Sequence, residues 1–276
     1  MTPLEKIFSQ TQVLPTIPKV VHELIQSLNN EDADIGKLAR SVSQDQVISA
    51  RVLRLANSSY YGSSRKVASI DDAVTLIGLN QLRILVIACG MAGSFVKVPG
   101  IDLNHFWRNS LLTAMVARLM AKEQEGINAE VAFTAGLMHG IGVLLIHNAF
   151  PDSAMQISKA CQDRSVTERA TIERELLQTD HCEVGSELAK RWNFADEIIN
   201  AIRYYCDPLS TEARGYATIV FVASYIALLI EQPEKTQILS DSMSAEISEK
   251  LKLGAESLAD RVEKYSVLKD AANSVL

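Results

Sequence analysis

The amino-acid sequence predicts an all-helical protein, and three observations lead to this fold class. Apolar residues make up 47% of the chain and charged residues 22%, which is typical of a globular protein and not of a disordered one. Glycines (13) and prolines (7) are too few for the many tight turns of a β-sandwich or barrel. Between the prolines, apolar residues recur at helical spacing along almost the whole chain.

The N-terminal third contains several short amphipathic stretches. Their apolar spacing predicts helices over about 19–29, 34–42, 43–57, 70–78 and 82–95. A loop is expected over 58–69, after which Ser69 can cap the fourth helix and Gly78 can end it. The fifth helix is apolar nearly all round, so we expect it at the centre of the fold.

The remaining helices follow a boundary expected at 96–100, which contains Pro99. They are predicted over about 104–123, 129–138, 140–149, 152–162, 167–178, 181–192, 195–206 and 212–231. Asp180 precedes the helix at 181 and is followed three residues later by Glu183, which resembles a capping box. The segment 241–270 is rich in Glu, Lys and Ser and predicts one or two surface helices.

The 276 residues are enough for one or two domains with a buried core. The net charge of −6 argues against a protein that binds polyanions through bulk electrostatics. Only residues 1–100 carry a basic excess, with 10 basic against 8 acidic side chains.

Residues 35–57 have the spacing of a helix-turn-helix, in which Arg51 and Arg54 would be the possible nucleic-acid contacts. The turn lacks glycine, the second helix has no other cation, and the whole chain is acidic. Two packed helices give the same spacing, so we favour this interpretation over DNA binding.

The four cysteines, Cys89, Cys161, Cys182 and Cys206, do not form a close pair in the sequence. We therefore expect free thiols in a reducing cytoplasm and neither a disulfide framework nor a zinc site. The longest apolar stretch, 216–230, has 15 residues, which is short of the roughly 18 to 20 that cross a bilayer. We expect a cytoplasmic protein without a membrane partner.

Two of the five histidines stand out. His139 lies among small and apolar residues, so burial would disfavour its charged form, and His181 follows Asp180 at a helix start. A histidine in an apolar setting is more often a hydrogen-bonded core residue than a ligand. His22, His105 and His147 are expected at the surface or at a boundary.

Several ordered blocks of the chain resemble a known family. They are Leu14–Pro18, Leu53–Gly62, Ile70–Leu79, Phe106–Leu111, Ala135–Val143, Asp180–Gly185 and Ala201–Pro208. In this order they resemble the HDOD family, the HD-related output domains of bacterial signalling. The resemblance implies a multi-helical fold in which an N-terminal helical lobe (1–98) packs on an HD-like lobe (99–210), with C-terminal helices following (211–276).

The HDOD family is related to the HD phosphohydrolases, in which histidines and a His-Asp pair hold a divalent metal that activates water. This chain departs from that pattern at several positions. It has Asn109 where a histidine is frequent, Gly140 where the paired aspartate belongs, Val143 where a lysine is common, and Tyr205 and Cys206 where two histidines are often found. His139, Asp180 and His181 remain.

These departures imply a degenerate metal site and a catalytically inactive signalling protein. Such a protein would bind a signalling partner or a small regulatory ligand, and Asn109, His139, Asp180 and His181 would form a relict pocket. No cofactor is expected, and a homodimer is compatible with this interpretation. The alternative is a phosphohydrolase with altered ligands, in which His139, Asp180 and His181 hold the metal and Asn109 orients the substrate.

Overall fold

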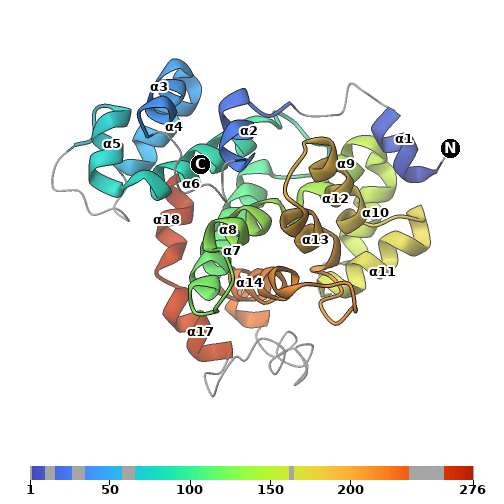
Figure 1. The fold of residues 1–276 in the computed structure, drawn as a ribbon. Helices are drawn as coiled ribbons and strands as arrows, with labels where there is room; N and C mark the ends of the chain where they lie inside the picture. The colour runs from blue at the N-terminus through green and yellow to red at the C-terminus, as the bar shows by residue number, and fades with distance from the viewer. Residues whose placement is uncertain are drawn as a thin grey trace.

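The computed structural model describes residues 2–9, 16–26, 35–57, 66–161, 165–235 and 258–275. All regular structure in these ranges is helical, which confirms the predicted fold class (Figure 1). Buried side chains from the N-terminal third, the central part and the C-terminal helices belong to one hydrophobic cluster.

Five helices of the N-terminal third pack together, with the last of them at their centre. They are α2 (Lys19–Gln26), α3 (Ile35–Gln44), α4 (Gln46–Ala56), α5 (Ile70–Ile77) and α6 (Leu79–Gly93). Helix α6 contacts α2, α4 and α5, as its apolar sequence predicts. The Ser69 hydroxyl accepts a hydrogen bond from the Asp72 amide at 3.0 Å, and Gly78 follows the helix with a φ of 81°, so both predicted ends of α5 are confirmed. Most of the predicted loop 58–69 lies outside the described residues.

The first helix, α1 (Pro3–Ser9), lies apart from the other N-terminal helices. Figure 1 shows it beside α9 (Ile141–Ala149) and α10 (Pro151–Ala160). The Arg191 guanidinium lies 4.3 Å from the centre of the Phe8 ring, and the Lys6 ammonium lies 5.0 Å from that of Phe150. The start of the chain is therefore attached to the HD-like part.

Three long or apolar helices form the middle of the molecule. They are α7 (Leu103–Lys122), α8 (Ala129–Met138) and α14 (Gly215–Glu231), and each contacts the other two. Gly136 lets α8 approach α7 closely, since a Cβ there would lie 2.9 Å from the Cα of Ala114. The segment Ala129–Ala149 is long and apolar enough to cross a membrane, but 89% of its most apolar window is buried inside the protein. Because it breaks into α8 and α9 at His139 and Gly140, it is a pair of core helices.

The HD-like part is completed by α11 (Val166–Leu177), α12 (His181–Arg191) and α13 (Asp196–Tyr204). Asp180 caps α12 by accepting from the Glu183 amide at 2.7 Å. The predicted reciprocal contact does not form, because the Glu183 carboxylate accepts from the Thr179 hydroxyl instead. Helices α9 and α12 touch at Gly142, where backbone meets backbone.

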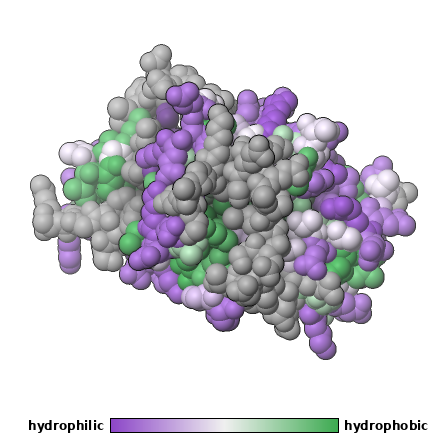
Figure 2. Space-filling view, turned by 90° about the horizontal axis from the view of Figure 1, so that it is seen from below, coloured by the Kyte–Doolittle hydropathy of each residue, from purple (hydrophilic) through white to green (hydrophobic). Residues whose placement is uncertain are grey.

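The C-terminal helices are less superficial than the sequence predicts. The described part contains α17 (Leu258–Tyr265) and α18 (Leu268–Val275), while most of the predicted segment 241–270 lies outside it. Tyr265 and Leu268 are buried, and α18 packs on both α7 and α4. In α18 one face is apolar and buried, with Leu268, Ala271 and Ala272. Seen from below, hydrophobic residues gather near the middle of the face (Figure 2).

We expect Gly142→Ala to destabilise the fold strongly. The new Cβ would lie 2.0 Å from the His181 carbonyl oxygen and 2.8 Å from the Gly185 amide nitrogen, so α9 and α12 would have to separate. A loss of about 3 kcal/mol or more in the free energy of unfolding is expected in urea titrations. The matched control is Gly215→Ala, whose Cβ would meet only the end of the Ile127 side chain. Equal stability of the two variants would contradict the close approach.

Candidate functional site

His181 lies at the centre of a buried polar cluster in the HD-like part. It is the first residue of α12, which Asp180 caps, and only 1% of it is exposed. Its Nδ1 lies 2.5 Å from the Oε2 of Glu173, which also accepts from the His181 main-chain amide at 2.8 Å. Its Nε2 lies 2.6 Å from the Tyr205 hydroxyl. Both ring nitrogens therefore have partners.

Glu173 reaches His181 from α11 and has no exposed surface. Its second oxygen, Oε1, accepts from the Arg169 Nε at 2.8 Å. Burial alone would raise the pKa of Glu173, but the charges of His181 and Arg169 and the hydrogen bonds from His181 lower it to about 2. The carboxylate is thus ionised and fully hydrogen-bonded inside the protein.

His181 responds to this carboxylate. Burial opposes its charged form, but the neighbouring Cys182 sulfur and the Glu173 carboxylate outweigh burial and raise the pKa of His181 to about 10. Burial also raises the pKa of Cys182 well above its ordinary value, which keeps this residue a neutral thiol at pH 7. Because the Cys182 thiol is neutral at pH 7, the Glu173 carboxylate is the ionised neighbour that favours the proton on His181 there.

His139 behaves in the opposite way. It follows α8, and its Nδ1 donates to the Gly136 carbonyl oxygen at 2.6 Å. Burial outweighs this hydrogen bond and lowers the pKa of His139 to about 4, with nearby His181 acting in the same direction. The Tyr205 ring stands edge-on to both imidazoles, with ring centres 5.1 Å from His139 and 5.7 Å from His181. Tyr205 thus joins a neutral and a cationic histidine.

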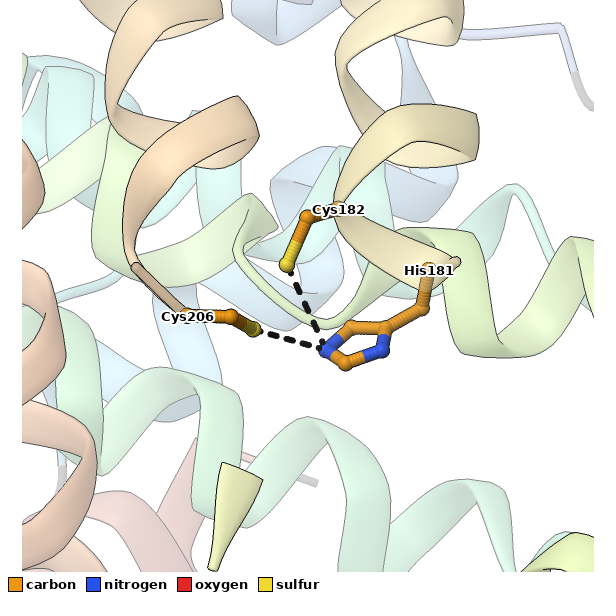
Figure 3. A group of neighbouring side chains, drawn as sticks. All are labelled: His181, Cys182 and Cys206. Carbon is orange, nitrogen blue, oxygen red and sulfur yellow. Dashed lines mark hydrogen bonds between the residues drawn. The ribbon is translucent and has the colours of Figure 1, made fainter. Parts of the chain in front are cut away.

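Two cysteines that are distant in sequence complete the cluster. The Sγ of Cys206, just after α13, lies 3.3 Å from the His181 Nε2, and the Sγ of Cys182 lies 3.7 Å from it. Figure 3 shows both sulfurs directed at this nitrogen from two different helices. The donor atoms of His181, Cys182 and Cys206 all lie within 4.8 Å of one another. Cys182 and Cys206, which are far apart in the sequence, are thus neighbours in space, and the four cysteines are free as predicted.

The predicted relict pocket is assembled only in part. His139 and His181 meet at Tyr205, whereas the Asp180 carboxylate caps α12 and pairs with Arg174 at 2.8 Å and with Arg203 at 3.8 Å. Asn109 is half-buried on α7, and the described contacts do not join it to the other three residues. The sequence missed Glu173, Cys182, Cys206 and Tyr205 as partners of His181.

The hydrolytic metal that the resemblance implies does not fit the residues present. Gly140 has no side chain, and a Cβ added to it would lie 3.3 Å from the ring of Phe106. The Asp180 oxygens are taken by a backbone amide and two arginines. Because hard divalent ions of hydrolytic sites need oxygen and imidazole ligands around an open position, this centre lacks the required carboxylates.

His147 is not at the surface, which corrects the sequence-based expectation. It is completely buried in α9, where its Nδ1 donates to the Pro99 carbonyl oxygen at 2.9 Å and its Nε2 lies 3.1 Å from the Ser158 hydroxyl. The predicted boundary at Pro99 is therefore fixed to the HD-like part by a buried imidazole.

Arg51 and Arg54, the residues of the DNA hypothesis, line a cavity of about 430 Å³ between α4, α6 and the start of α7. The Arg51 Nη1 donates to the Cys89 carbonyl oxygen at 2.9 Å, so this side chain makes an internal hydrogen bond. Trp107 and Asn104 of α7 also line the cavity.

We expect Glu173→Gln to lower the free energy of unfolding by about 3 kcal/mol, since it leaves His181 buried without its counter-charge. The pair stabilises fully between pH 4.5 and 6.5, the ordinary pKa values of the two groups. The His181 contribution is lost as the pH rises towards about 10, and that of Glu173 as it falls towards about 2. Urea unfolding across pH should show this alkaline decline in the wild type and not in the variant.

Glu187→Gln is the control for this substitution, because it breaks a similar but exposed pair with Arg191 one helix away. A change within about 0.5 kcal/mol is expected there. A Glu173→Gln protein with the stability and alkaline decline of the wild type would show that the buried pair is not ionised.

Comparison with known proteins agrees with the all-helical fold. A Shewanella amazonensis protein described as a candidate phosphohydrolase is 34% identical, with a TM-score of 0.77 over 98% of this chain and 96% of its own. An HDOD domain protein of unknown function from Geobacter sulfurreducens is 26% identical, with the same TM-score and coverage.

Two longer curated proteins are also similar in sequence. Ribonuclease Y of Petrotoga mobilis is 26% identical over 83% of this chain, and an uncharacterized Treponema pallidum protein is 26% identical over 70% of it. The chain spans only 38% and 37% of these two proteins. The HDOD domain family itself matches residues 14–208, which are most of the sequence, and the chain therefore belongs to the HDOD family.

Proposed function

We propose that this protein is a non-catalytic HDOD signalling module that acts by binding a protein partner or a small regulatory ligand. The observation that carries the proposal is the filled centre of the HD-like part. Glu173 and Tyr205 occupy both nitrogens of His181, and Phe106 borders Gly140 where a metal-binding carboxylate would stand. Side chains that already satisfy one another leave no oxygen ligands for a hydrolytic ion.

The cavity beside Arg51 supports the ligand-binding form of the proposal. Its volume of about 430 Å³ suits a small molecule, and two arginines on its wall would favour an anionic one. It lies where the N-terminal helices meet the start of α7, so an occupant would touch both parts of the fold. DNA is not part of this proposal, and a homodimer stays a prediction.

The proposed location is the bacterial cytoplasm. Cys89, Cys161, Cys182 and Cys206 are all free thiols, which suits a reducing compartment.

A second candidate function is metal-dependent phosphoester hydrolysis. The 34% identity to a candidate phosphohydrolase over 98% of the chain favours it. His139, Asp180 and His181 would then hold the metal, and Asn109 would orient the substrate. Asp180 would first have to give up its cap on α12 and its pairing with Arg174.

We expect no hydrolysis of bis(p-nitrophenyl) phosphate or of cyclic dinucleotides by the purified protein with Mn²⁺, Fe²⁺, Ni²⁺ or Zn²⁺. Turnover by a catalytic HD phosphohydrolase in the same assay is the positive control. Metal-dependent turnover that disappears in His139→Ala would overturn the proposal and establish the second function. Metal uptake without turnover leaves the proposal standing.

A further inference from the structure

The cluster around His181 contains three donor atoms that suit a different kind of ion. One imidazole nitrogen and two cysteine sulfurs come together from the start of α12 and the end of α13 (Figure 3). Sulfur and imidazole are the ligands of zinc, whereas the hydrolytic ions of the related enzymes need carboxylates. The lack of carboxylate ligands, which excludes the hydrolytic centre, does not exclude an ion that prefers sulfur and imidazole.

We propose that His181, Cys182 and Cys206 form a zinc site, in which the Nε2 atom and the two thiolates are the protein ligands. In tetrahedral zinc, bonds of about 2.3 Å to sulfur and about 2.0 Å to nitrogen place these two atoms roughly 3.5 Å apart. The two sulfurs lie 3.3 Å and 3.7 Å from Nε2, on either side of this value. The Tyr205 hydroxyl, 2.6 Å from Nε2, would have to move aside for the ion to enter.

Glu173 gives the site the outer support that zinc-binding histidines usually have. Such histidines donate their second ring nitrogen to a carboxylate, which fixes the ring and leaves the first nitrogen for the metal. Glu173 binds the Nδ1 of His181 and is itself held by Arg169 at 2.8 Å. The orientation of the imidazole is therefore set before any ion arrives.

Three protein ligands leave the fourth position of a tetrahedral ion to a water molecule, and burial keeps the ion away from bulk solvent. All three ligands are buried, and a dication with two thiolates is a neutral group whose burial costs little. On binding, Nε2 would lose its proton and its hydrogen bond with Tyr205, and the two thiols would lose their protons, so three protons would leave for solvent with each ion bound. The zinc would link α12 to the end of α13, where the Thr167 hydroxyl of α11 already donates to the Cys206 carbonyl oxygen at 3.1 Å.

The test is a titration of the full chain with Co²⁺ during refolding in a phosphine reductant, because a buried site loads as the chain folds. One Co²⁺ per chain should bind, with sulfur-to-cobalt charge-transfer absorption and the intense visible bands of a tetrahedral ion. Zn²⁺ should abolish these bands. Absence of the charge-transfer absorption in the wild type would overturn the proposal.

Single-cysteine variants identify the ligands. Cys182→Ser and Cys206→Ser should each weaken Co²⁺ binding at least 10-fold, whereas Cys161→Ser, outside the cluster, should bind like the wild type. Unchanged affinity in both cluster variants would assign the ion to an adventitious position. If a cluster variant does not fold, X-ray absorption of the zinc-loaded wild type decides, since two sulfur neighbours support the site and none or one overturns it.

Different experimental outcomes would contradict the zinc site and the proposed non-catalytic function. Zinc held by sulfur without phosphoester hydrolysis agrees with both, and hydrolysis by a protein that lacks the sulfur-bound ion contradicts both. Hydrolysis by a chain with sulfur-bound zinc would overturn only the non-catalytic function.

Discussion

Glu173 has no contact with solvent, yet its carboxylate is ionised, and the HD-like part of the structure is arranged around that charge. The carboxylate accepts three hydrogen bonds, two from His181 and one from Arg169. These bonds set where α12 begins and which way the imidazole faces. Tyr205 then packs against the same ring, so α11, α12 and α13 share one buried electrostatic centre. Without Glu173 this centre would be a buried cation with no counter-charge.

The substitutions that separate this chain from a hydrolytic HD protein form a consistent set. A glycine after His139 makes room for an aromatic ring, and a tyrosine and a cysteine near the end of α13 replace two basic ligands with a phenol and a thiol. Each change replaces a group that would bind a hard metal ion with one that packs in the core or that prefers a soft metal ion. Under the proposed non-catalytic function, the polar character of the centre is kept without the ligands that would hold an ion to activate water.

Much of the fold could be predicted from the sequence because its signals are local. The Ser69 cap, the Gly78 end and the apolar surround of α6 all depend on neighbours within one or two turns. The cluster at His181 could not be predicted from the sequence, because the approach of Cys206 to Cys182 depends on how α13 packs against α12. His147 was misplaced for a similar reason, since its partner Pro99 is 48 residues away.

The path of the chain also constrains how the two lobes can move. Helix α1 begins the N-terminal segment but packs on α9, whereas α18 ends the chain and lies across α7 and α4. His147 ties the connecting segment itself to α9. The N-terminal helices and the HD-like part are therefore joined by α1 and by α18 as well as by the contact of α6 with α8. In the proposed signalling function, a change in one part would reach the other through these two ends of the chain.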